Sequence, residues 1–127
     1  MPNNLVTPGT EIALLVDMTM KLFDHWQLSN NEKLSLLCVQ STDTYLLAQL
    51  TGGHLESLQS ESLNRIVHLI DIHAKLKTIF PQNIELAYKW ITQPNKAFGS
   101  VTPIKLIETH GEEGITTIQS YLNTNLI

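Results

Sequence analysis

The sequence predicts an all-α fold. Apolar residues recur every three or four positions along most of the chain, which is the spacing of one face of a helix. Ser, Thr or Asn precedes most of these stretches, and Gly or Pro follows them, as is usual at the two ends of helices. With 127 residues, 43% of them hydrophobic, the chain can form one packed domain or two very small ones.

The chain opens with a loose arm and a first helix. Residues 1–9 hold two prolines and a glycine, so no regular structure is expected there. Thr10 can cap a helix over residues 11–26 through its hydroxyl oxygen. The apolar positions of this helix recur at helical spacing and predict one buried face: Ile12, Leu15, Val16, Thr19, Leu22, Phe23 and Trp26.

Two short helices follow. The segment SNNE at 29–32 matches a capping box and predicts a helix as far as Leu37. Ser41 or Thr42 can cap the next helix, which should end before the glycine pair at 52–53. A short helix, a tight turn and a second short helix of this size match a helix-turn-helix unit.

A longer helix is expected over residues 60–80, where Pro81 stops it. It carries two apolar rows, one of Leu63, Ile66, Val67, Ile70 and Ala74 and another of Leu69, Ile72, Leu76 and Ile79. A helix that is apolar on two sides is usually buried on both. We therefore expect it to join the two halves of the chain.

The C-terminal part should hold three more helices. The first covers residues 83–91, with one apolar face made of Ile84, Ala87, Tyr88 and Ile91. A break at Pro94-Asn95 and a turn around Gly99 follow. Thr102-Pro103 then restarts a helix, since a capping hydroxyl precedes a proline at the first helical position.

That helix should end near Thr109, and residues 111–114 should form a turn. The last helix has its apolar residues on one face, with Tyr121 beside them: Ile115, Ile118 and Leu122.

Composition narrows the class of protein. The net charge is −4, so nucleic acid binding would need a local basic patch. The single cysteine, Cys38, excludes an internal disulfide and favours a reducing compartment. We find neither a signal-peptide pattern at the N-terminus nor an apolar run of the ~20 residues that span a bilayer, so a cytoplasmic location without membrane contact is expected.

The helix-turn-helix-like unit is poorly equipped to read DNA. No Lys or Arg stands between Lys33 and Arg65, whereas phosphate contacts usually need basic donors. Cys38 occupies the turn position that is usually glycine. A scaffold or dimer surface is therefore favoured over a DNA reader. If the unit does read DNA, its contacts are expected to be Ser41, Thr42, Thr44, Tyr45 and Gln49.

The sequence contains few patterns typical of catalytic or metal-binding sites. His68 and His73 are five residues apart on the long helix, whereas two zinc ligands on one helix face stand three or four apart. With Asp71 they are better explained as polar positions between the apolar rows. Cys38 has no neighbouring base, and the sequence has no glycine-rich phosphate loop. We expect no catalytic residue, no metal, no cofactor and no enzymatic activity.

One ordered string of residues carries a family resemblance: Trp90, Pro94-Asn95, Phe98, Gly99, Thr102-Pro103, Leu106-Ile107, a glycine at 111 or 114, and Tyr121-Leu122. This string resembles the C-terminal toxin-binding domain of the Xre/MbcA/ParS antitoxins. Further upstream, three stretches are similar to the family's Xre-like helix-turn-helix and connecting helix: residues 26–29 with 36–39, residues 63–66, and residues 79–81. The resemblance covers about residues 20–125.

The resemblance implies how the chain is divided. Residues 1–9 would be the arm, 10–58 the helix-turn-helix-like domain, 59–80 the connecting helix and 81–127 the toxin-binding domain. It also implies the function of an antitoxin that neutralises a RES-domain toxin, which degrades NAD, by binding it and covering its active site. A homodimer and repression of the operon through its DNA operator are implied as well.

Carried over to this chain, the toxin-binding residues would be Trp90, Pro94, Asn95, Phe98, Gly99, Pro103, Leu106 and Tyr121. Trp90 and Phe98 can equally be core residues that hold the last helices together. Two other functions stay open, namely a stand-alone helix-turn-helix transcription regulator and an interaction protein that has no toxin.

This chain departs from the family pattern at three places. It has Ser100-Val101 where relatives have a second glycine and a basic residue, and Leu46 and Leu47 where many have aromatic and basic residues. Its tail, residues 123–127, lacks a glycine- and arginine-bearing ending.

Overall fold

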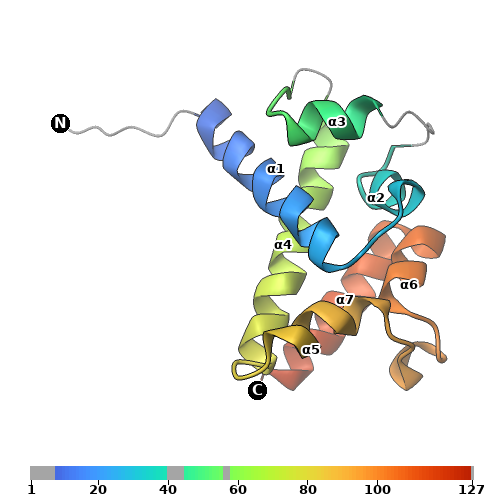
Figure 1. Ribbon diagram of the computed structural model, residues 1–127. Helices are drawn as coiled ribbons and strands as arrows, with labels where there is room; N and C mark the ends of the chain where they lie inside the picture. Colours follow the sequence, from blue (N-terminus) through green and yellow to red (C-terminus); the bar gives the residue numbers. More distant parts are fainter. Residues whose placement is uncertain (1–7, 40–44, 56–57, 127) are drawn as a thin grey trace.

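The computed structural model describes residues 8–39, 45–55 and 58–126. Over these ranges the chain is all-α, as predicted, with seven α-helices and two 3-10 turns (Figure 1). The elements are α1 (Pro8–His25), α2 (Asn30–Leu36), α3 (Tyr45–Thr51), α4 (Ser60–Ile79), α5 (Ile84–Lys89), η1 (Trp90–Thr92), η2 (Lys96–Phe98), α6 (Pro103–His110) and α7 (Glu112–Asn125).

Helix α1 begins earlier than predicted. It starts at Pro8, so Thr10 lies inside the first turn and is not the N-cap. Proline is well suited to a first turn, because its missing N–H would have no partner there and its φ angle is already helical. The predicted inner face is correct: Val16, Thr19, Leu22, Phe23 and Trp26 are buried, and Ile12 and Leu15 are partly buried against them.

Helix α2 has the predicted capping box. The backbone N–H of Glu32 donates to Ser29 Oγ, and the N–H of Ser29 donates to Glu32 Oε1. After α2, Cys38 has a φ of 63°, in the left-handed region that favours glycine. This agrees with its place at a turn position usually held by glycine. The predicted caps Ser41 and Thr42 lie outside the described residues, so a helix-turn-helix geometry stays a prediction.

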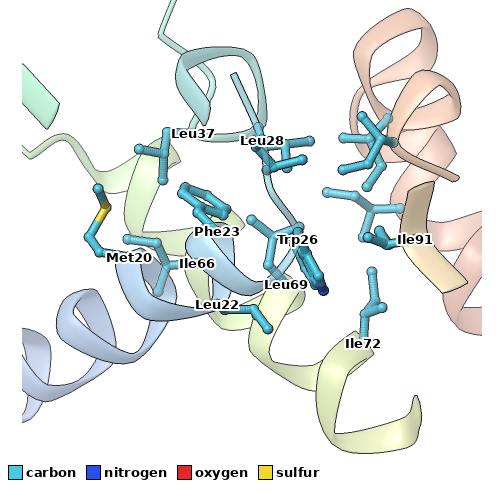
Figure 2. Close-up of a cluster of buried hydrophobic side chains, with 14 of the residues drawn as sticks. Met20, Leu22, Phe23, Trp26, Leu28, Leu37, Ile66, Leu69, Ile72 and Ile91 are labelled. Atoms are coloured by element: carbon cyan, nitrogen blue, oxygen red, sulfur yellow. The ribbon is translucent and has the colours of Figure 1, made fainter. Parts of the chain in front are cut away.

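Helix α4 is the central element. It packs against α1 on one side and against α5 and α7 on another, so it joins the two halves as expected (Figure 1). Figure 2 shows Ile66 and Leu69 of α4 near Phe23 of α1 and near Trp26, which directly follows α1.

Only one of the two predicted apolar rows of α4 is deeply buried. Leu69, Ile72 and Leu76 are fully enclosed, as is Ile66 of the other row. The prediction was wrong for Val67, which is 48% exposed, and for Ala74, which is also exposed. These two side chains stand on the side of α4 that no described helix covers.

The helix predicted over 83–91 is shorter and continues as a 3-10 turn. Asn83 caps α5 by accepting a hydrogen bond from Leu86 N, and α5 gives way to η1 at Trp90. Ala87 and Ile91 are buried as predicted, but Ile84 is 42% exposed, so that part of the predicted apolar face does not reach the core.

Helices α6 and α7 cross very closely. Thr102 caps α6 with Pro103 at its start, as predicted, and Gly111 separates the helices with a φ of 59°. The predicted turn over 111–114 is wrong beyond Gly111, because α7 already begins at Glu112. A Cβ on Gly114 would lie 2.5 Å from Leu106 O, so only glycine fits at this crossing.

The N-terminal and C-terminal halves also meet through a buried cation. Arg65 of α4 is only 6% exposed. Its Nε donates to Glu112 Oε2 at 2.8 Å, and its Nη1 donates to the backbone oxygen of Leu36. One side chain therefore ties α4 to the end of α2 and to the start of α7. Over the described ranges, no helix is long and apolar enough to cross a membrane.

Candidate functional site

Three aromatic rings from distant parts of the C-terminal half meet at the protein surface. Trp90 begins η1, Phe98 ends η2 and Tyr121 lies on α7. The ring centroids are 6.1 Å apart for Trp90 and Phe98, 5.3 Å for Phe98 and Tyr121, and 6.2 Å for Trp90 and Tyr121. All three side chains are half-buried. We call these residues the aromatic cluster.

The segment between two of these rings, residues 93–101, is a compact turn organised by Asn95. The Asn95 side-chain oxygen accepts a hydrogen bond from Ala97 N at 2.9 Å. Its backbone oxygen accepts from Phe98 N and Ser100 N, and its own N–H donates to Val101 O in an isolated antiparallel bridge. Asn95 therefore stabilises the turn through hydrogen bonds of both its side chain and its backbone.

Two consecutive left-handed residues close this turn. Gly99 has a φ of 71° and Ser100 a φ of 66°. Left-handed backbone strains residues that carry a Cβ, which is why glycine is usual there. The second glycine expected at position 100 from the family resemblance therefore has a structural reason, and Ser100 occupies the same conformation at some cost.

The structure separates the predicted toxin-binding residues by exposure. Pro94 and Gly99 are exposed, whereas Asn95 and Leu106 are half-buried, as are the three residues of the aromatic cluster. Pro103 is buried at the start of α6, so its main contact is with the core. The exposed tip of the turn also includes Ser100, and it includes three residues that sequence reasoning did not single out, Gln93, Lys96 and Ala97.

The aromatic cluster also packs inward. Its three residues lie against the hydrophobic core as partly buried members. Each ring thus presents one side to solvent and another to the core, which suits a surface that is rigid before any partner binds. Interface and folding roles are compatible for these residues.

Further apolar side chains are exposed in the same half of the protein. Leu86 of α5 is 47% exposed, Ile84 is 42% exposed and Leu126 after α7 is 39% exposed. Figure 1 places α5 and the C-terminal end of α7 at the same end of the protein. Exposed side chains of this kind, near an ordered turn with few charges, are typical of protein contact surfaces.

The structure describes only two of the five residues predicted to contact DNA. Ser41, Thr42 and Thr44 lie outside the described residues. Tyr45, the first residue of α3, is 68% exposed, whereas Gln49 is half-buried. The basic residues that flank this region in sequence have acidic partners: Lys33 pairs with Asp24 at 3.7 Å, and Arg65 is buried against Glu112.

The histidines of α4 have structural partners. Gln119 of α7 donates from Nε2 to Asp71 Oδ2 at 2.9 Å and lies 3.2 Å from His68 Nδ1. His73 stacks on Tyr88 of α5, with ring centroids 5.3 Å apart. Among the described residues, no group of three or more His, Cys, Asp or Glu side chains could hold a metal ion.

His25, at the end of α1, also stacks on Tyr88, with ring centroids 4.1 Å apart. Tyr88 therefore links α1, α4 and α5, which sequence reasoning missed because the three residues are far apart in the chain. Burial lowers the pKa of His73 below its usual 6.5, and the nearby charges of Lys77 and His25 lower it further.

Comparison with known proteins identifies the C-terminal half. Residues 75–124 match the family described as the antitoxin Xre/MbcA/ParS C-terminal toxin-binding domain. The chain is also similar to the uncharacterized protein y4oB of Sinorhizobium fredii (strain NBRC 101917 / NGR234), with 24% identity over 103 residues, which cover 81% of this chain and 77% of that protein. No solved structure matches the chain. The aromatic cluster and the Asn95 turn both lie inside the range that matches the Xre/MbcA/ParS antitoxin toxin-binding family.

Proposed function

We propose that this chain is the antitoxin of a type II toxin–antitoxin pair, and that it neutralises a RES-domain toxin by direct binding. The observation that carries the proposal is the family match over residues 75–124, the range that contains the aromatic cluster. The RES class of toxin, which degrades NAD, is the partner that the family resemblance implies. Neutralisation would be stoichiometric and would need no chemistry from the antitoxin.

The turn over residues 93–101, together with the aromatic cluster, is the proposed toxin-binding surface. Its Asn95 hydrogen bonds hold the exposed Pro94 and Ala97 in place, so little conformational entropy would be lost on binding. Lys96 is the only charged residue between Trp90 and Thr102. The central part of protein interfaces is depleted of charge and enriched in aromatic residues, which fits this surface.

Covering of the toxin active site is proposed to involve the end of α7. Tyr121 joins the aromatic cluster to α7, and the last described residues, Asn125 and Leu126, follow within two turns of the helix. The tail lacks basic residues. Occlusion by this tail would therefore rely on shape and apolar contact, and not on a salt bridge with the toxin.

Operator binding is the part of the family resemblance that α3 supports least. Phosphate contacts provide much of the affinity for DNA, and α3 has no basic side chain. We propose that any repression of the operon needs the assembled toxin–antitoxin complex, which could bring basic groups from the partner.

Co-expression tests the antitoxin function. The chain is tagged and produced with a RES-domain toxin encoded beside its gene, and both growth and co-purification are measured. We expect the chain to restore growth and to co-elute with the toxin on size exclusion. A toxin that stays toxic and elutes alone would refute the proposal.

A matched pair of variants tests the surface. Ala97→Asp places a charge on the exposed turn, whereas Asn64→Asp makes the same charge change on the exposed side of α4 near its N-terminal end. We expect Ala97→Asp to weaken co-purification and Asn64→Asp to leave it unchanged, with both variants folded by circular dichroism. Equal behaviour of the two variants would remove the turn from the interface.

A further inference from the structure

A cavity of about 360 Å³ lies between the end of α1 and the segment formed by α5 and η1. Residues 25–27 form one part of its wall, and residues of α5 and η1, together with Gln93, form the rest. No residue of the aromatic cluster lines it. Cavities of about 300–1,000 Å³ with a few polar groups are the usual binding sites of small organic molecules. We call this candidate site the junction cavity.

Trp26 gives the junction cavity a buried hydrogen-bond donor. It is only 2% exposed, and its indole Nε1–H has no hydrogen-bond partner among the described residues. Buried tryptophan N–H groups usually have a partner, because a buried donor without one destabilises the fold. The N–H is covered in the free chain, so an acceptor reaches it when an exposed side chain of the cavity wall turns aside. Gln27 and Lys89 are exposed and long enough to do so.

Lys89 adds a positive charge to the same wall. Its side chain is exposed, and it takes part in none of the ion pairs between described residues. Gln27 and Gln93 contribute side-chain amides, which can also donate hydrogen bonds. An indole N–H, an unpaired ammonium group and two amides together favour an anionic ligand with oxygen acceptors.

The backbone of Gln27 supports a role for its side chain. Gln27 lies two residues after the end of α1 with a φ of 57°, a left-handed conformation that glycine or asparagine usually provides after a helix. Glycine would remove the strain, but it would also remove a side chain from the cavity wall. Strained residues of this kind are frequent at ligand-binding sites.

Stacked rings hold another part of the wall in place. Tyr88 stacks on His25, with ring centroids 4.1 Å apart, and on His73 of α4, with ring centroids 5.3 Å apart. His25 and Tyr88 both line the junction cavity, so this part of the site is ordered before a ligand binds. A preformed wall reduces the entropy that is lost on binding.

We propose that the junction cavity binds a small organic monocarboxylate. The carboxylate would pair with Lys89 and accept a hydrogen bond from Trp26 Nε1, since hydrogen bonds to a charged group are stronger than neutral ones. The carbon part of the ligand would lie beside the rings of Trp26 and Tyr88. Glu85 also lines the cavity and would repel a second negative charge, so dicarboxylates should bind less well. This inference goes beyond toxin binding and does not depend on it.

Titration of the isotope-labelled full chain with benzoate tests the proposal, with the indole N–H signals followed by NMR. The chain has two tryptophans, so Trp90 in the aromatic cluster serves as the internal reference. We expect the Trp26 signal to shift and to saturate below ~10 mM benzoate, while the Trp90 signal moves much less. Benzamide, which has the same shape without the charge, should bind about ten-fold more weakly, as should the dicarboxylate phthalate.

Charge variants of α5 should change the affinity for benzoate in opposite directions. Lys89→Gln should weaken binding by about ten-fold, because it removes the paired cation, and Glu85→Gln should strengthen it by about three-fold. Both side chains are exposed, so both variants should fold. Lys105→Gln and Glu108→Gln make the same charge changes at exposed positions of α6 and serve as matched controls with little effect.

Three results would overturn the proposal. The first is a Trp26 signal that benzoate leaves unmoved up to ~10 mM. The second is equal binding of benzoate and benzamide, which would remove the carboxylate from the recognition. The third is a Lys89→Gln chain that binds benzoate as tightly as the Lys105→Gln control. Because the chain is measured alone, none of these results depends on whether it neutralises a toxin.

Discussion

Arg65 and Glu112 are 47 residues apart in sequence, yet Arg65 Nε donates to Glu112 Oε2 at 2.8 Å. The guanidinium is buried, whereas the Glu112 side chain is 57% exposed. The same Arg65 donates to Leu36 O at the end of α2. The pair thus holds together the two halves of the chain at the point where α7 begins.

Loss of this contact should destabilise the whole chain. Arg65→Ala removes both hydrogen bonds and leaves a void, so we expect the free energy of unfolding to fall by about 2–3 kcal/mol. Glu112→Gln should cost about 1 kcal/mol, because the carboxylate is partly solvated. Glu113→Gln, its exposed neighbour, should change stability by less than ~0.5 kcal/mol. Urea unfolding measures all three, and equal effects of the two glutamate variants would contradict the role of Glu112.

The crossing of α6 and α7 should be intolerant of any added side chain. A Cβ at Gly114 would stand 2.5 Å from Leu106 O and 2.9 Å from its carbonyl carbon, so the helices must move apart. We expect Gly114→Ala to cost about 3 kcal/mol. Gly52→Ala is the control, since its Cβ would meet no atom closer than 3.4 Å. Thermal unfolding distinguishes the two, and a Gly114→Ala chain as stable as Gly52→Ala would contradict this packing.

Ser100 should be a site where glycine stabilises the fold. Its φ of 66° strains a residue with a Cβ, and its side chain is exposed. Relief of this strain exceeds the added backbone entropy of glycine in the unfolded chain, so we expect Ser100→Gly to gain about 0.5 kcal/mol. Ser120→Gly on the exposed side of α7 should lose about 0.5 kcal/mol. Denaturant midpoints that shift in the same direction for both variants would rule out strain at position 100.

Acid should weaken the junction of α1, α4 and α5. The folded chain lowers the pKa of His73, so the unfolded chain binds the proton more readily. Well above pH 6.5, His73 is neutral in both states and this difference in pKa does not affect stability. As the pH falls through 6.5 toward the pKa of the folded state, the unfolded chain takes up the proton first and the free energy of unfolding falls. His73→Phe keeps a ring against Tyr88 and removes the proton site. Unfolding measured between pH 7.5 and 5.5 should show a smaller loss of stability in acid for His73→Phe than for the original chain, and equal losses would contradict this role of His73.

Local signals in the sequence were reliable for the fold. The capping residues Ser29 and Thr102 set helix starts as predicted, because a cap depends on neighbours within three residues. The packing between helices was harder to predict from the sequence. Which apolar row of α4 is buried depends on where α1 and α7 lie, and the burial of Arg65 depends on Glu112. Gly114 was predicted to lie in a turn, because the close contact that requires glycine there comes from another helix.

The candidate site could be predicted only in part, because local signals say little about contacts between distant elements. The break at Pro94-Asn95 and the turn at Gly99 follow from local chemistry, and the structure has both. The meeting of Trp90 and Phe98 with Tyr121 could not be read from spacing, since it depends on the course of α7. The stack of His25 and His73 on Tyr88 was missed because it joins three separate helices.

We propose that the Asn95 turn and the aromatic cluster bind a RES-domain toxin and stop its chemistry. The most direct measurement is NAD consumption by the purified toxin, titrated with this chain. We predict that activity falls in proportion to added chain and ends at a fixed molar ratio, and that Ala97→Asp requires about ten-fold more chain. Undiminished NAD consumption in the presence of a large excess of folded chain would contradict the claim.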